Sequence, residues 1–182
     1  MLNRRDPLLT VPRNAIIYRD ELKKGRISNA YFVFADVRGF TPLTESLKKL
    51  GKEGAERIAM EINALMEPIC KNALSKGGNI IAIEGDAILV SFENLADALS
   101  FSKKIISETE GVIDTGTEEF SISIDVGLSR GPFYEAIIGD EERRVYFTAG
   151  SGLKGAYLAE KLANSDVVSN FEFAHTTPIR RG

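Results

Sequence analysis

The sequence predicts an α+β fold: a ferredoxin-like, split βαβ core in which a mostly antiparallel sheet has its helices on one face. Three observations lead to this class. Apolar patterning alternates between the periods of strands and helices in the order β-α-β-β-α-β. A tight apolar hairpin lies near the middle of the chain. The composition, 43% hydrophobic and 27% charged in 182 residues, is that of one soluble domain. We therefore expect an N-terminal arm or linker at residues 1–28 and one domain at residues 29–182.

The first half of the pattern begins with the strand Tyr31–Asp36 (YFVFAD), an apolar, β-rich run that ends at a carboxylate. Apolar residues then recur at helical spacing over Glu53–Lys76, and Gly77-Gly78 ends this helix. Two apolar runs, Asn79–Glu84 and Ala87–Phe92, are separated by a Gly-Asp pair and predict a β-hairpin.

The second half begins with helical spacing over Leu95–Glu108. Phe120–Leu128 alternates as a half-buried strand does, and we expect it to turn at Ser129–Pro132 and pair with Phe133–Ile138. The other expected elements are short: a helical turn at Ile17–Lys24, a helix that begins at Thr41-Pro42 with Pro42 in its first position, a strand at Tyr146–Ala149, a helix at Ser151–Asn164 with Ser151 as its N-cap, and a strand at Asp166–Ser169.

Charge and composition exclude several classes of protein. The formal net charge is −3, and the chain is basic over its first 29 residues and acidic elsewhere, which argues against nucleic-acid binding. No apolar run approaches the roughly 20 residues of a membrane span, and no signal peptide precedes the domain, so we expect a cytoplasmic location. With only Cys70 and His175 available, a metal would have to be held by carboxylates, which favours Mg, Mn or Ca.

Two acids occupy positions that burial alone does not explain. Asp36 ends an apolar strand, and Asp86 lies in the turn of an apolar hairpin. In split βαβ order, the first strand lies beside the hairpin strand that follows the first helix, so the end of this strand faces the hairpin turn. Like charges that close would raise one pKa unless a cation lies between them. The residues therefore predict one or two divalent cations, with the Val37 carbonyl as a further ligand.

Structural roles are the alternatives for these acids. Asp86 follows a glycine in a turn, and Asp36 is placed to cap the helix that begins at Thr41-Pro42. The intervening loop favours the metal site, because backbone N–H groups of a glycine-containing loop at a helix N-terminus bind anions. Carboxylates beside a phosphate-binding loop are what phosphoryl or nucleotidyl transfer requires.

At these residues the chain resembles the class III adenylate/guanylate cyclases. Phe34–Glu45 (FADVRGFTPLTE) is similar to their first metal motif, and Gly77-Gly78 with Gly85-Asp86-Ala87 is similar to their second. Gly127–Pro132 (GLSRGP) resembles the glycine-rich strand turn that follows, and Gly139–Arg144 resembles the hairpin before the last catalytic helix. The resemblance covers about residues 30–170 and is nearest to the bacterial and soluble-type cyclases.

The resemblance implies the class III nucleotide cyclase fold and a dimer with sites at its interface. Asp36 and Asp86 would bind two Mg²⁺ or Mn²⁺ ions, one activating the ribose 3′-hydroxyl and the other holding the triphosphate. The product would be a 3′,5′-cyclic nucleotide, with pyrophosphate leaving, as in a phosphorus–oxygen lyase of cyclic-nucleotide signalling. The residues that would contact the substrate phosphates are Arg38, Gly39, Phe40, Thr41, Arg143 and Arg144.

The sequence departs from the family pattern at three positions. Ala82 lies four residues before the second aspartate, where the family has a Lys or Glu that reads the base. Glu84 is on the same face of the strand but is a poor substitute. In the last helix, Lys154 and Leu158 stand where the family has an Asn and an Arg. Lys161 lies nearly one turn further on, where a surface role is the alternative to a catalytic one.

Intact metal residues with degenerate base and transition-state positions suggest one half of a heterodimeric cyclase. The expected function is conversion of a nucleoside triphosphate, with ATP favoured, in a homodimer or with a complementary cyclase domain. The alternative is a catalytically inactive cyclase-like domain that binds nucleotide or a partner as a regulator, and a plain α+β interaction module is a third possibility. The C-terminal residues show no stop feature, as in a fragment of a longer protein.

Overall fold

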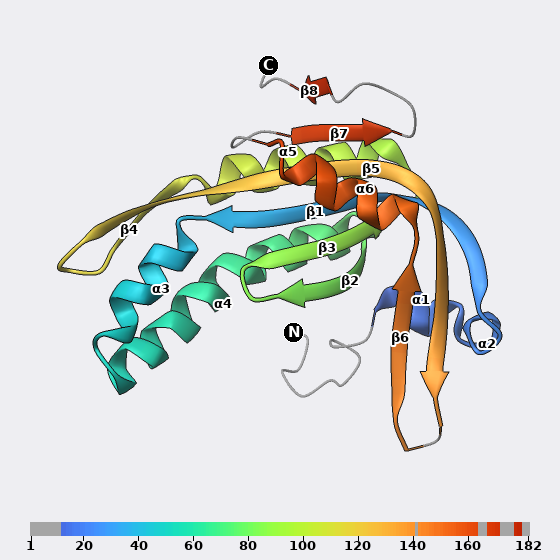
Figure 1. The fold of residues 1–182 in the computed structure, drawn as a ribbon, viewed down its shortest axis with the longest axis horizontal. Helices are drawn as coiled ribbons and strands as arrows, with labels where there is room; N and C mark the ends of the chain where they lie inside the picture. The colour runs from blue at the N-terminus through green and yellow to red at the C-terminus, as the bar shows by residue number, and fades with distance from the viewer. Residues whose placement is uncertain (1–11, 141, 164–166, 172–176, 180–182) are drawn as a thin grey trace.

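The structure is a computed structural model that describes residues 12–140, 142–163, 167–171 and 177–179 (Figure 1). Its elements are α1 (Arg13–Ile17), α2 (Arg19–Leu22), β1 (Arg26–Arg38), α3 (Phe40–Lys48), α4 (Lys52–Ser75), β2 (Asn79–Glu84), β3 (Ala87–Phe92), α5 (Leu95–Thr109), β4 (Gly111–Asp114), β5 (Glu119–Gly139), β6 (Arg144–Ala149), α6 (Ser151–Glu160), β7 (Val167–Phe171) and β8 (Thr177–Ile179). The sheet order is β2-β3-β1-β5-β7-β8, and β4 and β6 pair with opposite ends of β5. All of these pairs are antiparallel except β5–β7. The predicted α+β class is confirmed.

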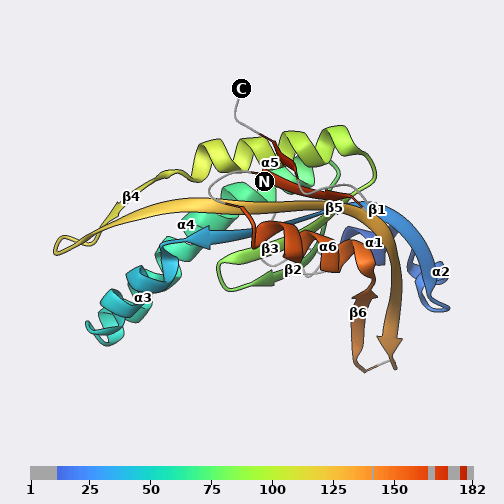
Figure 2. The ribbon, with the colours of Figure 1, turned by 45° about the horizontal axis from the view of Figure 1, so that its top comes forward.

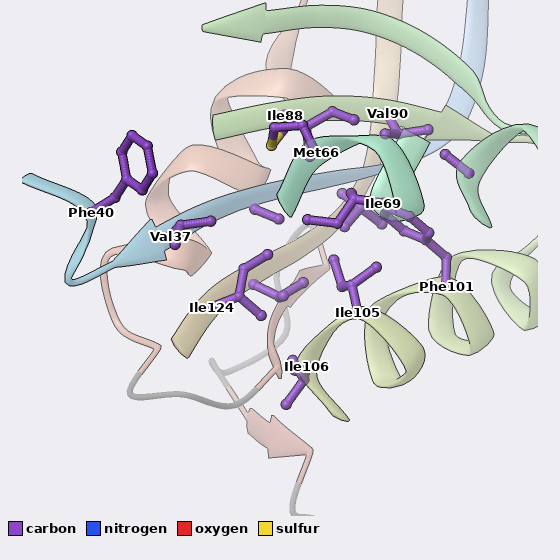
Figure 3. Packing of buried hydrophobic residues seen from close by; sticks show 14 of the residues in the cluster. Val37, Phe40, Met66, Ile69, Ile88, Val90, Phe101, Ile105, Ile106 and Ile124 are labelled. Carbon is purple, nitrogen blue, oxygen red and sulfur yellow. The ribbon is translucent and has the colours of Figure 1, made fainter. Parts of the chain in front are cut away.

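The sheet is covered on both faces. Val33, Ala35 and Val37 of β1 pack with α3, α4 and α5 in the larger core (Figure 3). The alternate β1 residues Phe32 and Phe34 pack with α6 in a second cluster. Figure 2 shows α5 and α6 on opposite sides of β5. The prediction of helices on one face is therefore right for α4 and α5 and wrong for α6. The continuous apolar run of β1 is typical of a strand that is buried on both faces, and this explains why helices cover both.

Most elements of the first half lie where the patterning predicts them. The long helix is α4, the hairpin is β2–β3 with the predicted bounds, and the next helix is α5. The short helix α3 begins at Phe40, so Pro42 is its third residue and not its first. The two-stranded extension formed by β4 with the start of β5 was not expected from the sequence.

The strand β5 is the main correction. Glu119–Gly139 is one continuous strand of 21 residues, so the expected turn at Ser129–Pro132 is wrong. Gly127 and Gly131 are small because α6 passes close to β5: a Cβ at Gly127 would overlap the Ala156 carbonyl oxygen, and one at Gly131 would lie 2.9 Å from the Gly152 nitrogen. The glycines that resemble a turn motif therefore serve helix–strand packing.

Gly127→Val is expected to destabilise the domain by roughly 1–3 kcal/mol, because the new side chain must push α6 away from the sheet. Urea unfolding would measure the change. Gly111→Ala is the matched control, since a Cβ there meets no atom within 4 Å. Equal stability of Gly127→Val and wild type would contradict the close approach.

The last helix begins differently from the prediction. Its N-cap is Gly150, without a side-chain capping bond, and Ser151 is the first helical residue. The helix ends at Glu160, so the predicted end at Asn164 is wrong. The predicted start of the last strand at Asp166 lies outside the described residues, as does His175.

Residues before the predicted domain also pack on the sheet. α1 and α2 occupy part of the expected arm, Leu22 is fully buried, and β1 begins at Arg26 instead of Tyr31. At the base of the β5–β6 hairpin, the fully buried Glu135 accepts hydrogen bonds from Asn14 Nδ2 (3.0 Å), Arg26 Nε (2.6 Å) and Tyr146 Oη (2.6 Å). The division at residues 28 and 29 stays a prediction. None of the helices in the described residues combines the length and apolar character that a membrane span requires.

Candidate functional site

Asp36 lies near the end of β1, and Asp86 lies in the turn that precedes the neighbouring strand β3. β1 pairs with β3 in a register that sets Asp36 opposite Ala87, the residue that follows Asp86. The expectation that the end of the first strand faces the hairpin turn is confirmed for the backbone. The neighbour is β3 and not β2, the strand that directly follows α4. All six residues of β3 are buried, whereas β2 is partly exposed and lies at the sheet edge.

The electrostatics agree with a pair of interacting acids. Burial raises the pKa of Asp36, and the charges of Asp86 and Asp125 raise it further, against a hydrogen bond from the Val37 backbone. A nearby cation would stabilise the ionised form of such a carboxylate, and carboxylate oxygens are ligands of Mg²⁺ and Mn²⁺. Within the described ranges, no three His, Cys, Asp or Glu side chains converge on one point. Asp36 and Asp86 thus fit part of a coordination sphere, with the rest left to backbone carbonyls, water or a ligand.

The alternative role of Asp36 as a helix cap is not seen. The N-cap of α3 is Gly39, in the left-handed region at φ 84°, and no side chain makes a capping bond there. A residue with a Cβ would be strained at this φ, and its Cβ would overlap the Ser121 carbonyl oxygen. This glycine therefore sets the sharp passage from β1 into α3 beside Asp36.

In the loop after Asp36, the backbone is better placed than the side chains to bind a phosphate. Val37 and Phe40 point into the core, with 4% and 5% exposure. Arg38 pairs with Asp125, and Thr41 is exposed. The first N–H groups of a helix lack intrahelical partners, so the start of α3 at Gly39–Thr41 is the part that suits a phosphate.

Two predicted phosphate contacts are not close to the acids within one chain. Arg143 and Arg144 lie at the turn between β5 and β6, where the Arg144 side chain and the Arg143 backbone bond to Asp140. Asp36 pairs with Asp125, in the first half of β5, whereas the turn to β6 follows the opposite end of that strand. In Figure 1 this turn and β4 lie at opposite ends of β5. The structure therefore does not bring these arginines to Asp36.

The degenerate base position lies on the same face as the acids. Ala82 is opposite Leu89 and Glu84 is opposite Ala87, after a bulge in β2, so both share the face of Asp36. Burial and the charge of Glu84 raise the pKa of Tyr157 in α6, whose ring packs on Phe34 at 4.1 Å. The predicted common face is thus confirmed, and Ala82 presents only a methyl group to it.

α6 exposes the positions that lack the family residues. Ala156 and Ala159 are fully buried against the sheet. Lys154, Leu158 and Lys161 are exposed, with Leu158 at 47%. These three side chains are therefore available to a second domain.

Sequence reasoning missed two acids near Asp36. Asp125 is 5% exposed and lies directly opposite Asp36 in the sheet. Glu160, in the last turn of α6, has its pKa raised by burial and by the charges of Asp36 and Asp125. The available signal was Asp125 itself, an acid in the FSISIDVGL strand, but it falls on the polar face of that pattern, which reads as solvated.

Asp36→Asn is expected to raise the free energy of unfolding of the metal-free domain at pH 7. Because the folded-state pKa of Asp36 is raised, its ionised form costs stability above that pKa. The gain should vanish near about pH 3, where both folded and unfolded states are protonated. Urea unfolding with a chelator present would measure it. Asp20→Asn is the control of opposite sign, since a hydrogen bond from Lys23 lowers the pKa of Asp20. A loss of stability in Asp36→Asn at pH 7 would contradict the prediction.

Comparison with known proteins finds both sequence relatives and solved structures with a similar fold. No family model matches the chain. Adenylate cyclase type 10 of Oryctolagus cuniculus is 30% identical over 166 residues, covering 84% of this chain and 10% of the relative. The chain thus spans about a tenth of the length of the relatives that it matches.

Solved structures of cyclases share the fold. The adenylyl cyclase CyaB from P. aeruginosa superposes with a TM-score of 0.64 at 20% identity, covering 80% of this chain and 78% of that one. The catalytic core of a rhodopsin-guanylyl cyclase with converted specificity, in complex with ATPαS, gives 0.65 at 20% identity over 80% and 79%. The chain is a homologue of adenylate cyclase type 10 with the fold of class III nucleotide cyclase catalytic domains.

Proposed function

We propose that the chain is a nucleotidyl cyclase catalytic domain that converts a nucleoside triphosphate, with ATP favoured, to a 3′,5′-cyclic nucleotide and pyrophosphate. The observation that carries the proposal is the position of Asp36 opposite Ala87 and beside Asp86, at the start of the loop into α3. The raised pKa of Asp36 supports it, since a cation would relieve the repulsion. Homology to adenylate cyclase type 10 favours ATP over GTP. We also propose that the domain acts in the cytoplasm.

The reaction makes one P–O bond and breaks another. The ribose 3′-oxygen bonds to the α-phosphorus, the bond from that phosphorus to the bridging oxygen breaks, and the 3′-hydroxyl proton passes to solvent as pyrophosphate leaves. Two bound Mg²⁺ or Mn²⁺ ions would lower the pKa of the 3′-hydroxyl and offset the charge on the phosphates. Asp36 and Asp86 would hold the ions, with the Val37 carbonyl, and the N–H groups at Gly39–Thr41 would donate to phosphate oxygens.

The chain supplies only part of a catalytic site. Ala82 offers no hydrogen bond to a base, and Leu158 offers no charge to the transition state. Because Lys154 and Leu158 are exposed on α6, a second domain that faces α6 would meet them. We therefore propose that activity requires a dimer, with a complementary domain that carries the missing groups.

A regulatory domain without activity is the second candidate, favoured by the same three degenerate positions. Formation of cyclic AMP from ATP and Mn²⁺, by this chain mixed with a complementary cyclase domain, separates the two. Turnover that requires both partners supports the catalytic proposal. Binding of ATPαS without turnover in any mixture supports the regulatory one.

A further inference from the structure

A third acid lies next to the proposed metal site. Asp125 of β5 is directly opposite Asp36 of β1, and residues in such pairs have Cβ atoms about 4.5–5.5 Å apart. Asp125 is 5% exposed, and its charge contributes to the raised pKa of Asp36. Like charges directly opposite each other in a sheet are unfavourable, so this arrangement needs a compensating cation.

Arg38 supplies that cation. It lies two residues after Asp36 on the same face of β1, diagonal to Asp125. Its Nε donates to Asp125 Oδ2 at 2.5 Å, and its Nη2 donates to the Ala163 carbonyl, just beyond α6, at 3.2 Å. The guanidinium thus connects the buried carboxylate with the end of the helix that covers it.

Both bonds hold the guanidinium of Arg38 at Asp125 and the end of α6, although the Arg38 side chain is 48% exposed. Turning the guanidinium away would leave Asp125, whose side chain is 7% exposed, as a buried charge without this partner.

We propose that Arg38 is a positioning residue that holds Asp125 away from the metal site formed by Asp36 and Asp86. The proposal rests on the proposed function of that site. A third carboxylate ligand would bind a divalent ion more tightly but would occupy a coordination position that substrate oxygens need. The absence of any convergence of three acids within the described residues agrees with this role.

Mn²⁺ alone, titrated into the full chain without nucleotide and followed by the EPR signal of free Mn²⁺, tests the proposal. Arg38→Gln keeps side-chain length and a donor but removes the charge, and it is expected to tighten Mn²⁺ binding on the order of tenfold, because Asp125 becomes a ligand. Arg38→Gln with Asp125→Asn is expected to lose that gain. Arg38→Lys retains a cation and is expected to bind Mn²⁺ as wild type does.

The outcomes separate this inference from the proposed function. Equal Mn²⁺ affinity of Arg38→Gln and the double variant would overturn it, since the gain would then not involve Asp125. The inference would also be wrong if Arg38→Gln binds Mn²⁺ as tightly as wild type or more weakly, provided that Asp36→Asn still weakens Mn²⁺ binding. If wild type and Asp36→Asn bind Mn²⁺ equally, the metal site itself, and with it the proposed function, is wrong. Circular dichroism of each variant checks the fold, and Arg38→Met, compared with and without Asp125→Asn, repeats the comparison if Arg38→Gln unfolds.

Discussion

Asp36→Ala and Asp86→Ala are each expected to abolish Mn²⁺- or Mg²⁺-dependent turnover in an assembly with a complementary domain, by at least about 10³-fold. Each substitution removes one of the two carboxylates proposed to hold the ions that activate the 3′-hydroxyl and offset phosphate charge. The measurement is cyclic AMP formation at saturating ATP and metal. Asp20→Ala, an exposed acid on α2, is the matched control and should leave turnover unchanged.

The fold should survive these substitutions. Asp36 and Asp86 repel each other in the absence of metal, so removing either relieves a like-charge contact. Circular dichroism of the variants should resemble wild type, urea unfolding with a chelator present should show no loss of stability, and metal binding should be lost. Undiminished turnover in either variant would rule out that residue as a metal ligand.

The isolated chain is expected to have little or no cyclase activity on ATP or GTP, even with Mn²⁺ and even as a dimer. A symmetric dimer supplies the same residues to both sites. Each site would meet Lys154 and Leu158 where a ribose-orienting Asn and a charge-stabilising Arg are needed. Losing one donor aimed at developing charge costs on the order of 10²–10³ in rate, and here two are replaced.

Adding a domain that carries the Asn, the Arg and a base-reading polar residue should restore activity. The purified chain, the partner alone and their mixture would be assayed side by side for cyclic AMP and cyclic GMP. A partner whose Asn and Arg are both replaced by Ala is the control. Robust turnover by the 182-residue chain alone would show that Lys161, Arg143 or Arg144 fills the gap, and the half-site interpretation would be wrong.

Local periodicity predicted the elements that positioned the two acids. The apolar run ending at Asp36, the helical spacing of α4 and the Gly-Asp turn of the hairpin are each set by nearby residues, so the sequence carries them. That is why the end of β1 and the turn before β3 were expected at one place. The choice of β3 over β2 as the neighbour depended on which hairpin strand is wholly buried, and this is a property of the assembled sheet.

The continuity of β5 could not be predicted in this way. Gly131 and Pro132 have the composition of a turn, yet Pro132 lies between the stretch paired with β7 and the stretch paired with β6. The missing N–H of Pro132 is tolerated because the edge of β5 that pairs with β7 and β6 has no described strand at this residue. Gly127 and Gly131 are required by the close approach of α6, a helix that follows later in the sequence. Asp125 was missed for the same reason, because α6 covers a face that the strand pattern marks as solvent.

Glu135 has a consequence for the smallest piece of this chain that can fold alone. A chain shortened to start at Ile27 would keep nearly the whole sheet but lose Asn14 and Arg26, two of the three described donors to this carboxylate. A buried carboxylate left with Tyr146 alone would have to take up a proton or open the base of the hairpin. The N-terminal limit of the autonomous folding unit is therefore set by the solvation of one anion as well as by the burial of Leu22.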